Sequence, residues 1–320
     1  MHVTGANGSA VYLELLQSLL DHGQPVSPRG QPTRELLDVQ VTITDPTAVH
    51  VLETARRSSA AITATESAHL IAGISSLQQL DDASGGRFSQ FADNGWLRGA
   101  YGPRAYHQLE RVIRVLAEDP DSRQAVVSIW TGNELAVPSK DVPCTLSLHF
   151  TIRDGKLLMR TSMRSNDIFL GFPIDVEVFA ALQKTIAAVL TVPAGSYTHV
   201  VGSLHLYDRD LTRVTAILKA GLGDKTRNSV LPDGAIPDVT ALLPLQRWHS
   251  SRQFTENVIM WDPGSSPQFE EEDREKWRPW QHELASRVPF LPAGKKPWQI
   301  CPRCRYITDG ECRECDLEPF

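Results

Sequence analysis

The stretch CTLSLHFTIRDGKLLMRTSMRSNDIFLGFP, residues 144–173, decides the fold. Over residues 145–153, apolar and polar residues alternate, as in a strand that buries one face. Asp154-Gly155 is a two-residue hairpin signal, so residues 156–164 are expected to form the return strand. Pro173 then opens a helix. The stretch therefore predicts a hairpin that leads directly into a helix.

Outside this stretch, helix and strand patterns mix without a regular βαβ repeat. Helical periodicity favours helices over residues 10–22, 63–74 and 104–118, and strand patterns favour residues 37–44 and 125–130. Residues 81–100 are glycine-rich and read as irregular. The mixture predicts an α+β fold with a mixed sheet and flanking helices. We expect a main domain over 1–262, a charged helix and linker over 263–299, and a cysteine-rich unit over 300–320.

The composition excludes several classes of protein. Of 320 residues, 41% are apolar and 22% are charged, so a sizeable core is expected and wholesale disorder is excluded. No apolar run is long enough for a transmembrane helix, and the first residues lack the pattern of a signal peptide. A net charge of −6 argues against general nucleic-acid binding. We expect a cytoplasmic protein without a membrane or nucleic-acid partner.

Four of the five cysteines form two Cys-x-x-Cys pairs near the end of the sequence: Cys301, Cys304, Cys312 and Cys315. Four thiolates suit tetrahedral Zn²⁺ and leave no open coordination position, so the spacing predicts a small structural zinc ribbon. The alternative is a redox dithiol pair. One isolated thiol beside such a foursome does not resemble a secreted disulfide framework.

The fifth cysteine, Cys144, follows Pro143 at the start of a predicted strand. A lone cysteine is commonly a small buried apolar residue. A reactive thiolate needs nearby positive charge, and a phosphate needs convergent arginine and hydroxyl groups. Arg123 precedes one predicted strand, and Arg164-Ser165 ends another. These residues could supply both requirements, which leaves a nucleophilic Cys144 open beside the structural alternative.

Four motifs carry a family resemblance: Asp121-Ser-Arg123, Pro143-Cys144, Arg164-Ser-Asn-Asp167-Ile-Phe-Leu-Gly171-Phe-Pro173 and His205-Leu-Tyr207. In order and spacing they resemble the thymidylate synthase family, over roughly residues 10–215. The resemblance implies the α+β thymidylate synthase fold. It also implies an obligate homodimer whose subunits meet back to back through their sheets.

The resemblance implies catalytic roles for three residues. Cys144 would add to C6 of a pyrimidine, which makes C5 a nucleophile toward the one-carbon unit of 5,10-methylenetetrahydrofolate. Glu66 matches the general acid/base glutamate of the family, and Tyr101 its active-site tyrosine. Glu66 has a structural alternative, because Thr63-Ala-Thr-Glu66 is also a capping box at a helix start.

The resemblance also implies the binding residues. The phosphate would be bound by Arg29, Arg164 and Ser165, together with Arg123 of the other subunit. The nucleoside would be bound by Asn166, Asp167, His205 and Tyr207. The folate would be bound by Phe88, Asp167 and Gly171. Two alternatives remain open. Arg29 could be a solvated loop charge, and His205 with Tyr207 could be a satisfied core pair.

Asp175 stands where thymidylate synthases carry asparagine. An asparagine amide can donate to O4 and accept from N3–H of uracil. A carboxyl group suits cytosine, because it accepts from N4–H and, when protonated, completes a bond to N3. Asp175 therefore predicts a cytosine base as well as a catalytic role. The alternative is an acidic residue placed in the first turn of a helix by the helix dipole.

Other differences from thymidylate synthases also favour a cytidylate substrate. Thr145 follows the cysteine, and Met163 precedes Arg164, as in the cytidylate hydroxymethylases that this sequence resembles. Those enzymes let water add to an exocyclic methylene intermediate and form a 5-hydroxymethyl-cytidylate and tetrahydrofolate. Phe88 stands near a family tryptophan, and a smaller ring there would leave room for water.

Two departures run against this assignment. Gln124 replaces the second arginine of the usual pair, and the C-terminal tail does not match the family's folate-closing terminus. The prediction is a folate-dependent C5-hydroxymethylase of CMP or dCMP. The alternatives are a C5-methylase of a pyrimidine nucleotide and a non-catalytic binding protein that uses the zinc ribbon. The residues do not distinguish ribose from deoxyribose.

Overall fold

The computed structural model describes residues 1–49, 51, 60–132, 134–136, 138–220, 299–300 and 307–308. The chain divides into two units, Met1–Trp130 with Ser139–Pro232, and Thr131–Pro138 with Asp233–Phe320. In the second unit, β8 (Gln299–Ile300) pairs antiparallel with β9 (Ile307–Thr308). The four clustered cysteines and residues 263–298 lie outside the described residues, so the predicted zinc ribbon and linker stay predictions.

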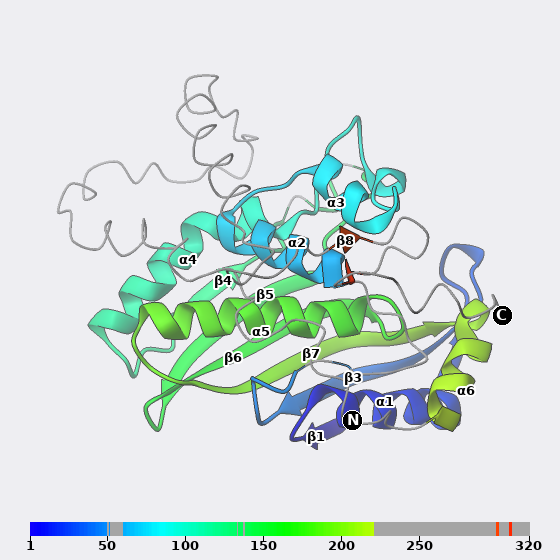
Figure 1. The fold of residues 1–320 in the computed structure, drawn as a ribbon, viewed down its shortest axis with the longest axis horizontal. Helices are drawn as coiled ribbons and strands as arrows, with labels where there is room; N and C mark the ends of the chain where they lie inside the picture. The colour runs from blue at the N-terminus through cyan, green and yellow to red at the C-terminus, as the bar shows by residue number, and fades with distance from the viewer. Residues whose placement is uncertain are drawn as a thin grey trace. The chain divides into compact units, whose positions relative to one another are not determined.

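A mixed sheet forms the centre of the first unit (Figure 1). Its order is β1-β3-β7-β6-β5-β4, with β2 paired to β3. The β1–β3 and β6–β7 pairs are parallel and the others are antiparallel. The strands are β1 (His2–Gly5), β2 (Gln24–Val26), β3 (Thr33–Ile43), β4 (Val126–Ser128), β5 (Thr145–Arg153), β6 (Lys156–Asp167) and β7 (Ala194–Tyr207).

Helices pack against this sheet, and α5 lies lengthwise across it in Figure 1. The helices are α1 (Gly8–His22), α2 (Ala60–Ala72), α3 (Leu77–Ser84), α4 (Tyr101–Glu118), α5 (Gly171–Val189) and α6 (Leu211–Ala220), with short 3₁₀ turns η1 (Pro28–Gly30), η2 (Ser89–Phe91) and η3 (Asp208–Asp210). The predicted α+β class with a mixed sheet and flanking helices is confirmed. None of the helices in the described ranges is long and apolar enough to cross a membrane.

The core lies between α5 and the sheet. Phe172, Val176 and Phe179 are wholly buried on α5, at helical spacing, and meet the inward side chains of β6 and β7. Each such side chain contributes about 1.5–3 kcal/mol through burial. The same layer contains the polar residues Tyr197 and His199, which the apolar pattern does not predict.

The hairpin predicted from residues 144–173 is confirmed. Asp154 and Gly155 have φ values of 50° and 69°, as a two-residue hairpin turn requires. The simple alternation is wrong at one point, because a register shift between Thr145 and Ser147 interrupts the β5–β6 pairing. This irregularity buries Thr145 and leaves Leu146 only half-buried, directly after Cys144.

Two further expectations need correction. Residues 81–84 are not irregular but complete α3, which Ser76 caps by accepting from the backbone N–H of Gln79. The capping-box alternative for Glu66 is also wrong. Thr63 lies inside α2, which already includes Ala60, and its side chain is buried. Because Thr63 does not begin the helix, a capping box does not explain Glu66.

Candidate active site

Close backbone packing brings the start of α4 beside the end of α2. A Cβ atom on Gly102 would lie 2.3 Å from the carbonyl oxygen of His69 and 2.5 Å from that of Ile74. Only glycine fits there, and this contact places Tyr101 near the face of α2 that carries Glu66. The Tyr101 ring stacks on Phe179 of α5, with centroids 6.0 Å apart.

The Tyr101 hydroxyl lies at the meeting point of the predicted catalytic residues. Burial raises its pKa well above the usual value, and the negative charges of Asp175, Cys144 and Glu66 add to the rise. The nearby Thr145 side chain lowers this pKa. These influences bring Glu66 of α2, Cys144 and Asp175 of α5 within electrostatic reach of Tyr101 at the start of α4.

Cys144 is a free thiol held beside Arg164. The Arg164 guanidinium donates to the carbonyl oxygens of Pro143 at 2.9 Å and Val142 at 2.9 Å, so it holds the segment before the thiol. Burial raises the pKa of Cys144, and the positive charge of Arg164 opposes this as the next-largest influence. Arg29 also lowers the pKa of Cys144, although its own side chain is exposed. The arginines are therefore placed both to favour a thiolate and to receive an anion.

Two carboxyl groups that influence Tyr101 have raised pKa values. Burial raises the pKa of Glu66 to about 8, with a further contribution from Asp175. Burial also raises the pKa of Asp175 to about 7, against a hydrogen bond from Asn166 that lowers it. Glu66 as a residue is only half-buried, but the enclosure of its carboxyl is the largest cause of the shift. Groups that exchange a proton near neutral pH are suited to general acid/base catalysis.

Replacing Glu66 by glutamine tests this assignment through stability. The folded pKa of about 8 exceeds the ordinary value of 4.5, so the folded chain keeps this proton longer than the unfolded chain. The resulting stability is complete below the ordinary pKa and is lost as pH rises through about 8. Glutamine cannot ionise and avoids this loss. We expect the melting temperature of Glu66→Gln, relative to wild type, to rise between about pH 5 and about pH 8.

Differential scanning calorimetry across that range measures the difference. The matched control is Glu118→Gln, which changes an exposed glutamate at the end of α4. Asp175 is present in all three proteins, so its own pH dependence cancels. A difference between Glu66→Gln and wild type that does not change with pH would contradict the raised pKa.

The Asp175 carboxyl is held from the core side. The Asn166 amide Nδ2 donates to Asp175 Oδ2 at 2.7 Å, and Asn166 Oδ1 lies 3.0 Å from His199 Nε2. Gly171 makes room for this bond, because a Cβ atom there would lie 2.9 Å from the Asn166 Nδ2 and 3.3 Å from Asp175 Oδ2. Gly171 thus lies against the active-site carboxyl, and Asn166 is buried behind it.

A second group of predicted residues lies where the parallel strands β6 and β7 end. The register pairs Ser165 with Ser203 and Asp167 with His205. Ser165 Oγ lies 3.3 Å from His205 Nδ1, and the His205 and Tyr207 rings meet edge to face at 5.2 Å. Both rings are half-exposed, so they are not a closed core pair. Their polar edges can receive a ligand.

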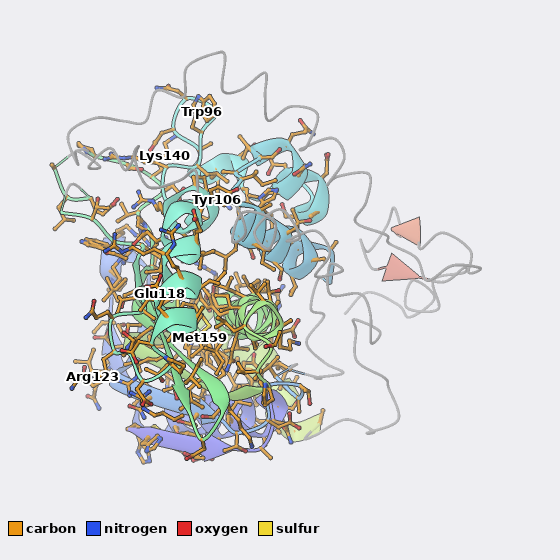
Figure 2. The ribbon with its side chains drawn as sticks, turned by 90° about the vertical axis from the view of Figure 1, so that its left-hand side faces the viewer. Trp96, Tyr106, Glu118, Arg123, Lys140 and Met159 are labelled. Atoms are coloured by element: carbon orange, nitrogen blue, oxygen red, sulfur yellow. The ribbon has the colours of Figure 1, made fainter. Side chains whose placement is uncertain are left out.

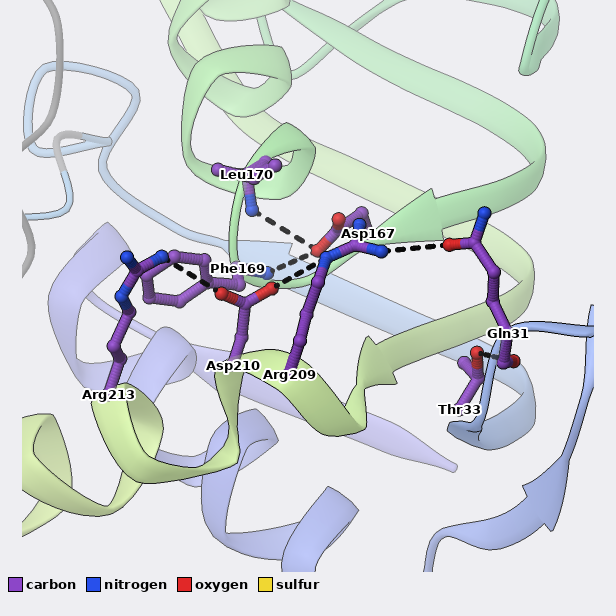
Figure 3. A network of polar contacts seen from close by, with 8 residues as sticks. All are labelled: Gln31, Thr33, Asp167, Phe169, Leu170, Arg209, Asp210 and Arg213. Carbon is purple, nitrogen blue, oxygen red and sulfur yellow. Dashed lines mark hydrogen bonds and ion pairs between the residues drawn. The ribbon is translucent and has the colours of Figure 1, made fainter.

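The Arg29 loop is tied to the same strand end (Figure 3). Arg209 stacks on the Tyr207 ring at 3.9 Å and donates to Gln31 Oε1 at 2.8 Å. The Asp208 N–H also donates to the carbonyl oxygen of Pro32 at 3.0 Å. Arg29 has a left-handed backbone, with φ 53°, inside this loop. The loop that carries Arg29 is therefore fixed relative to the His205–Tyr207 edge.

Asp167 shapes the turn that leads into α5. Its Oδ1 accepts from the backbone N–H groups of Phe169 at 2.8 Å and Leu170 at 3.2 Å (Figure 3). Burial raises the pKa of Asp167, and these bonds and His205 oppose the rise. Because the internal bonds are made through Oδ1, Oδ2 is the oxygen left to accept from a ligand.

Comparison with known proteins agrees with this geometry. Residues 10–227 match the family model described as thymidylate synthase. The chain belongs to the thymidylate synthase family. It is also similar to the deoxyuridylate hydroxymethyltransferase of Bacillus phage SP01, with 29% identity over 223 residues. That match covers 64% of this chain and 58% of the relative, so it spans less than two thirds of the relative's length.

The described contacts of this thymidylate synthase family member do not connect Arg123 or Phe88 to Cys144. Arg123 is exposed on the turn between α4 and β4 and lies at the edge of the molecule in Figure 2. Phe88 is half-exposed after α3, where its N–H donates to Asp81 Oδ1 at 2.8 Å. Their roles toward phosphate and folate stay predictions. Gln124, beside Arg123, is likewise exposed.

Sequence reasoning missed the polar residues behind Asp175. His199 and Tyr197 lie on the buried side of β7, and Thr161 lies opposite on β6. A signal was present, because histidine, tyrosine and threonine occupy positions of a strand face that is otherwise apolar. That signal needs the strand β7, which the sequence analysis did not predict.

Proposed function

We propose that this protein transfers a one-carbon unit from 5,10-methylenetetrahydrofolate to C5 of a cytidine 5′-monophosphate, CMP or dCMP, and forms the 5-hydroxymethyl product. The observation that carries this proposal is the convergence of Cys144, Glu66, Asp175 and Tyr101, with Arg164 beside the thiol. The family supports chemistry at C5 of a pyrimidine nucleotide. The SP01 relative, by its name, supports hydroxymethylation.

Each residue has a proposed task. Cys144 Sγ forms a bond to C6 of the base, and C5 becomes the nucleophile. Glu66 and Tyr101 lie where they can move protons during loss of the C5 hydrogen and addition of water. The S–C6 bond then breaks and restores the thiol. The atoms balance as cytidylate, methylenetetrahydrofolate and water giving hydroxymethyl-cytidylate and tetrahydrofolate.

When bound, the folate supplies a one-carbon unit at the oxidation level of formaldehyde. Asp167 fits such a ligand, because its Oδ1 is used by backbone N–H groups and its Oδ2 is left to accept from the N–H groups of the folate ring. Gly171 beside Asp175 keeps the same wall free of a side chain. We assign folate contact to Asp167, Gly171 and Phe88, and nucleotide contact to Arg29, Arg164, Ser165, His205 and Tyr207.

The choice of base rests on Asp175. Its carboxyl, with a pKa of about 7, accepts from cytosine N4–H through one oxygen and, when protonated, donates to N3 through the other. A uridylate is the second candidate. The same protonated carboxyl can donate to O4 and accept from N3–H of uracil, and the SP01 relative is named for deoxyuridylate.

Product analysis tests the proposed function. Purified protein receives methylenetetrahydrofolate and an equal mixture of CMP, dCMP, UMP and dUMP, and mass spectrometry identifies the products. We expect one added CH₂O group on a cytidylate, with the sugar preference read from the same spectrum. A product formed only from UMP or dUMP would overturn the assignment of the base.

We further propose that the enzyme is a homodimer in which Arg123 of one subunit binds the phosphate held by the other. Arg123 is exposed and lies at the edge of the view in Figure 2, so its guanidinium is open to a partner subunit.

Subunit complementation tests the shared site. We expect Arg123→Ala and Cys144→Ala to be nearly inactive alone and to recover about a quarter of wild-type activity after unfolding and refolding together. Half of the dimers would then be mixed, and each would hold one intact site. Gln124→Ala, which changes the exposed neighbour of Arg123, is the control and should not complement Cys144→Ala beyond its own activity. Absence of recovery from dimers that re-form would refute sharing.

We also propose that the chain is organised as a catalytic domain over 1–262, a linker over 263–299 and a structural zinc ribbon over 300–320. The support is the spacing of Cys301, Cys304, Cys312 and Cys315. Within the described ranges, no group of three or more histidine, cysteine or acidic residues is placed to hold a metal.

Metal analysis tests the ribbon. We expect stoichiometric zinc in the wild-type protein by plasma mass spectrometry, and its loss in Cys304→Ser and Cys315→Ser. Cys144→Ser is the matched control, because it removes a thiol outside the cluster and should keep the metal. Zinc that survives the loss of both cluster cysteines would show that they are not ligands.

A further inference from the structure

A chain of buried polar side chains runs from Asp175 into the core beneath α5. Asn166 is 3% exposed, and His199, Tyr197 and Thr161 are 0% exposed. Burying polar groups is costly unless they are hydrogen-bonded, and here each one has a partner. His199 Nδ1 lies 2.8 Å from the Tyr197 hydroxyl, and that hydroxyl lies 3.1 Å from the Thr161 hydroxyl.

The proton positions near Asp175 follow from this chain. Asn166 Oδ1 can only accept, so the His199 Nε2 that lies 3.0 Å away must carry the ring proton and donate it. Burial lowers the pKa of His199 to about 3, which keeps the ring neutral. Nδ1 is then an acceptor, and it shares the single proton of the Tyr197 hydroxyl with Thr161 Oγ1. Phe172 packs edge to face on the ring at 5.3 Å.

This arrangement fixes the Asn166 amide. Its oxygen accepts from His199 and its NH₂ group donates to Asp175, so the amide is held at both ends. In the observed orientation, Asn166 Nδ2 donates to Asp175 Oδ2 at 2.7 Å. The bond favours the unprotonated state of that oxygen, because a proton on Oδ2 would weaken it as an acceptor. When Asp175 is neutral, its proton therefore resides on Oδ1.

We propose that Asn166, held by His199, determines how strictly the site distinguishes cytosine from uracil by fixing which oxygen of Asp175 donates and which accepts. The inference rests on the proposed function, because it requires a pyrimidine at Asp175. Cytosine offers an acceptor at N3 and a donor at N4, and uracil offers the opposite order. A carboxyl whose donor oxygen and acceptor oxygen are fixed matches only one of these bases. A carboxyl whose proton can move between the two oxygens matches both. Asn166 is thus a positioning residue that acts through Asp175.

The test is a competition between CMP and UMP in one reaction, or between dCMP and dUMP if the enzyme prefers deoxyribose. The ratio of kcat/KM values is read by mass spectrometry. Both bases compete for the same enzyme molecules, so a partly unfolded variant changes the rate but not the ratio. The ratio of Kd values, measured by calorimetry, reports the same discrimination when turnover is absent.

We expect Asn166→Ala to reduce the ratio by about tenfold, the effect of losing one hydrogen bond to a charged or strongly polar group. Tyr197→Phe, which removes only the hydroxyl facing His199, should shift the ratio in the same direction and less. His199→Gln offers a replacement amide donor for Asn166 Oδ1 and should keep most of the discrimination. Tyr12→Phe is the control, a wholly buried tyrosine that stacks on Phe172 and should leave the ratio unchanged.

The outcomes separate this inference from the proposed function. A wild-type preference for uridylate would overturn the proposed base but not the inference, because loss of Asn166 should still relax whichever preference exists. An unchanged ratio in Asn166→Ala and Tyr197→Phe would overturn the inference while the cytidylate function stands. If Asn166→Ala does not fold, Tyr197→Phe decides, and a ratio equal to that of Tyr12→Phe refutes the proposal.

Discussion

Replacing Cys144 by alanine is expected to abolish formation of the product, with a loss in kcat of at least ~10⁴-fold, because the reaction has no other route to activate C5. Cys144 is the one cysteine in the described part of the chain, and Arg164 and Asp175 influence its thiol. Arg164 and Ser165 remain in the variant and should still bind the nucleotide phosphate. We expect Kd for the nucleotide within about threefold of wild type.

Single-turnover kinetics with methylenetetrahydrofolate measures the loss, and calorimetry measures Kd. Cys144→Ser is the conservative companion and should be almost as inactive, because a hydroxyl is a far weaker nucleophile than a thiolate. Turnover by Cys144→Ala within about tenfold of wild type would refute covalent catalysis at this residue. Loss of nucleotide binding with loss of turnover would show instead that the site had collapsed.

Replacing Asp175 by asparagine is expected to reverse the preference for the base. The new amide can turn its NH₂ group to the position from which Asp175 accepts from cytosine N4–H, although this orientation loses the hydrogen bond from Asn166. A donor there suits uracil O4 and opposes the cytosine amino group. Because a site built for one hydrogen-bonding pattern rejects the other strongly, we expect the cytidylate-to-uridylate ratio of kcat/KM to fall by about 10³-fold.

The same competition assay measures this reversal. Asp154→Asn is the matched control, because Asp154 lies in the β5–β6 turn with a left-handed backbone that asparagine also adopts. A variant at Asp175 that keeps its preference for cytidylate would contradict the assigned role. So would a variant that loses both bases equally, since that result would mean that Asp175 acts only in catalysis.

Local sequence patterns predicted the parts of the site that depend on neighbouring residues. The hairpin around Asp154-Gly155 places Arg164 of β6 opposite Cys144, which directly precedes β5, and the N–H of Arg164 donates to the Cys144 carbonyl oxygen. The turn brings the two residues near each other, and the register shift between Thr145 and Ser147 sets the pairing of Cys144 with Arg164. The fold class was also predictable, because strand and helix patterns mixed without a βαβ repeat.

The other parts of the site depend on contacts between residues far apart in the sequence. The chain from Asn166 to His199 depends on the parallel pairing of β6 with β7, which joins segments separated by the whole of α5. No local pattern encodes that pairing. The shift after Thr145 likewise arises from pairing with β6 and defeats the simple alternation. Thr63 shows the same limit, because its local capping signal lies inside a longer helix.

The most direct test of the central claim is the mass of the product formed by the wild-type enzyme in water labelled with heavy oxygen. The reaction contains methylenetetrahydrofolate with CMP and dCMP, and Cys144→Ala is run beside it. We predict a hydroxymethyl group on the cytidylate that carries the heavy oxygen, and no product from the variant. A methyl product, or an equal yield from the variant, would contradict the account.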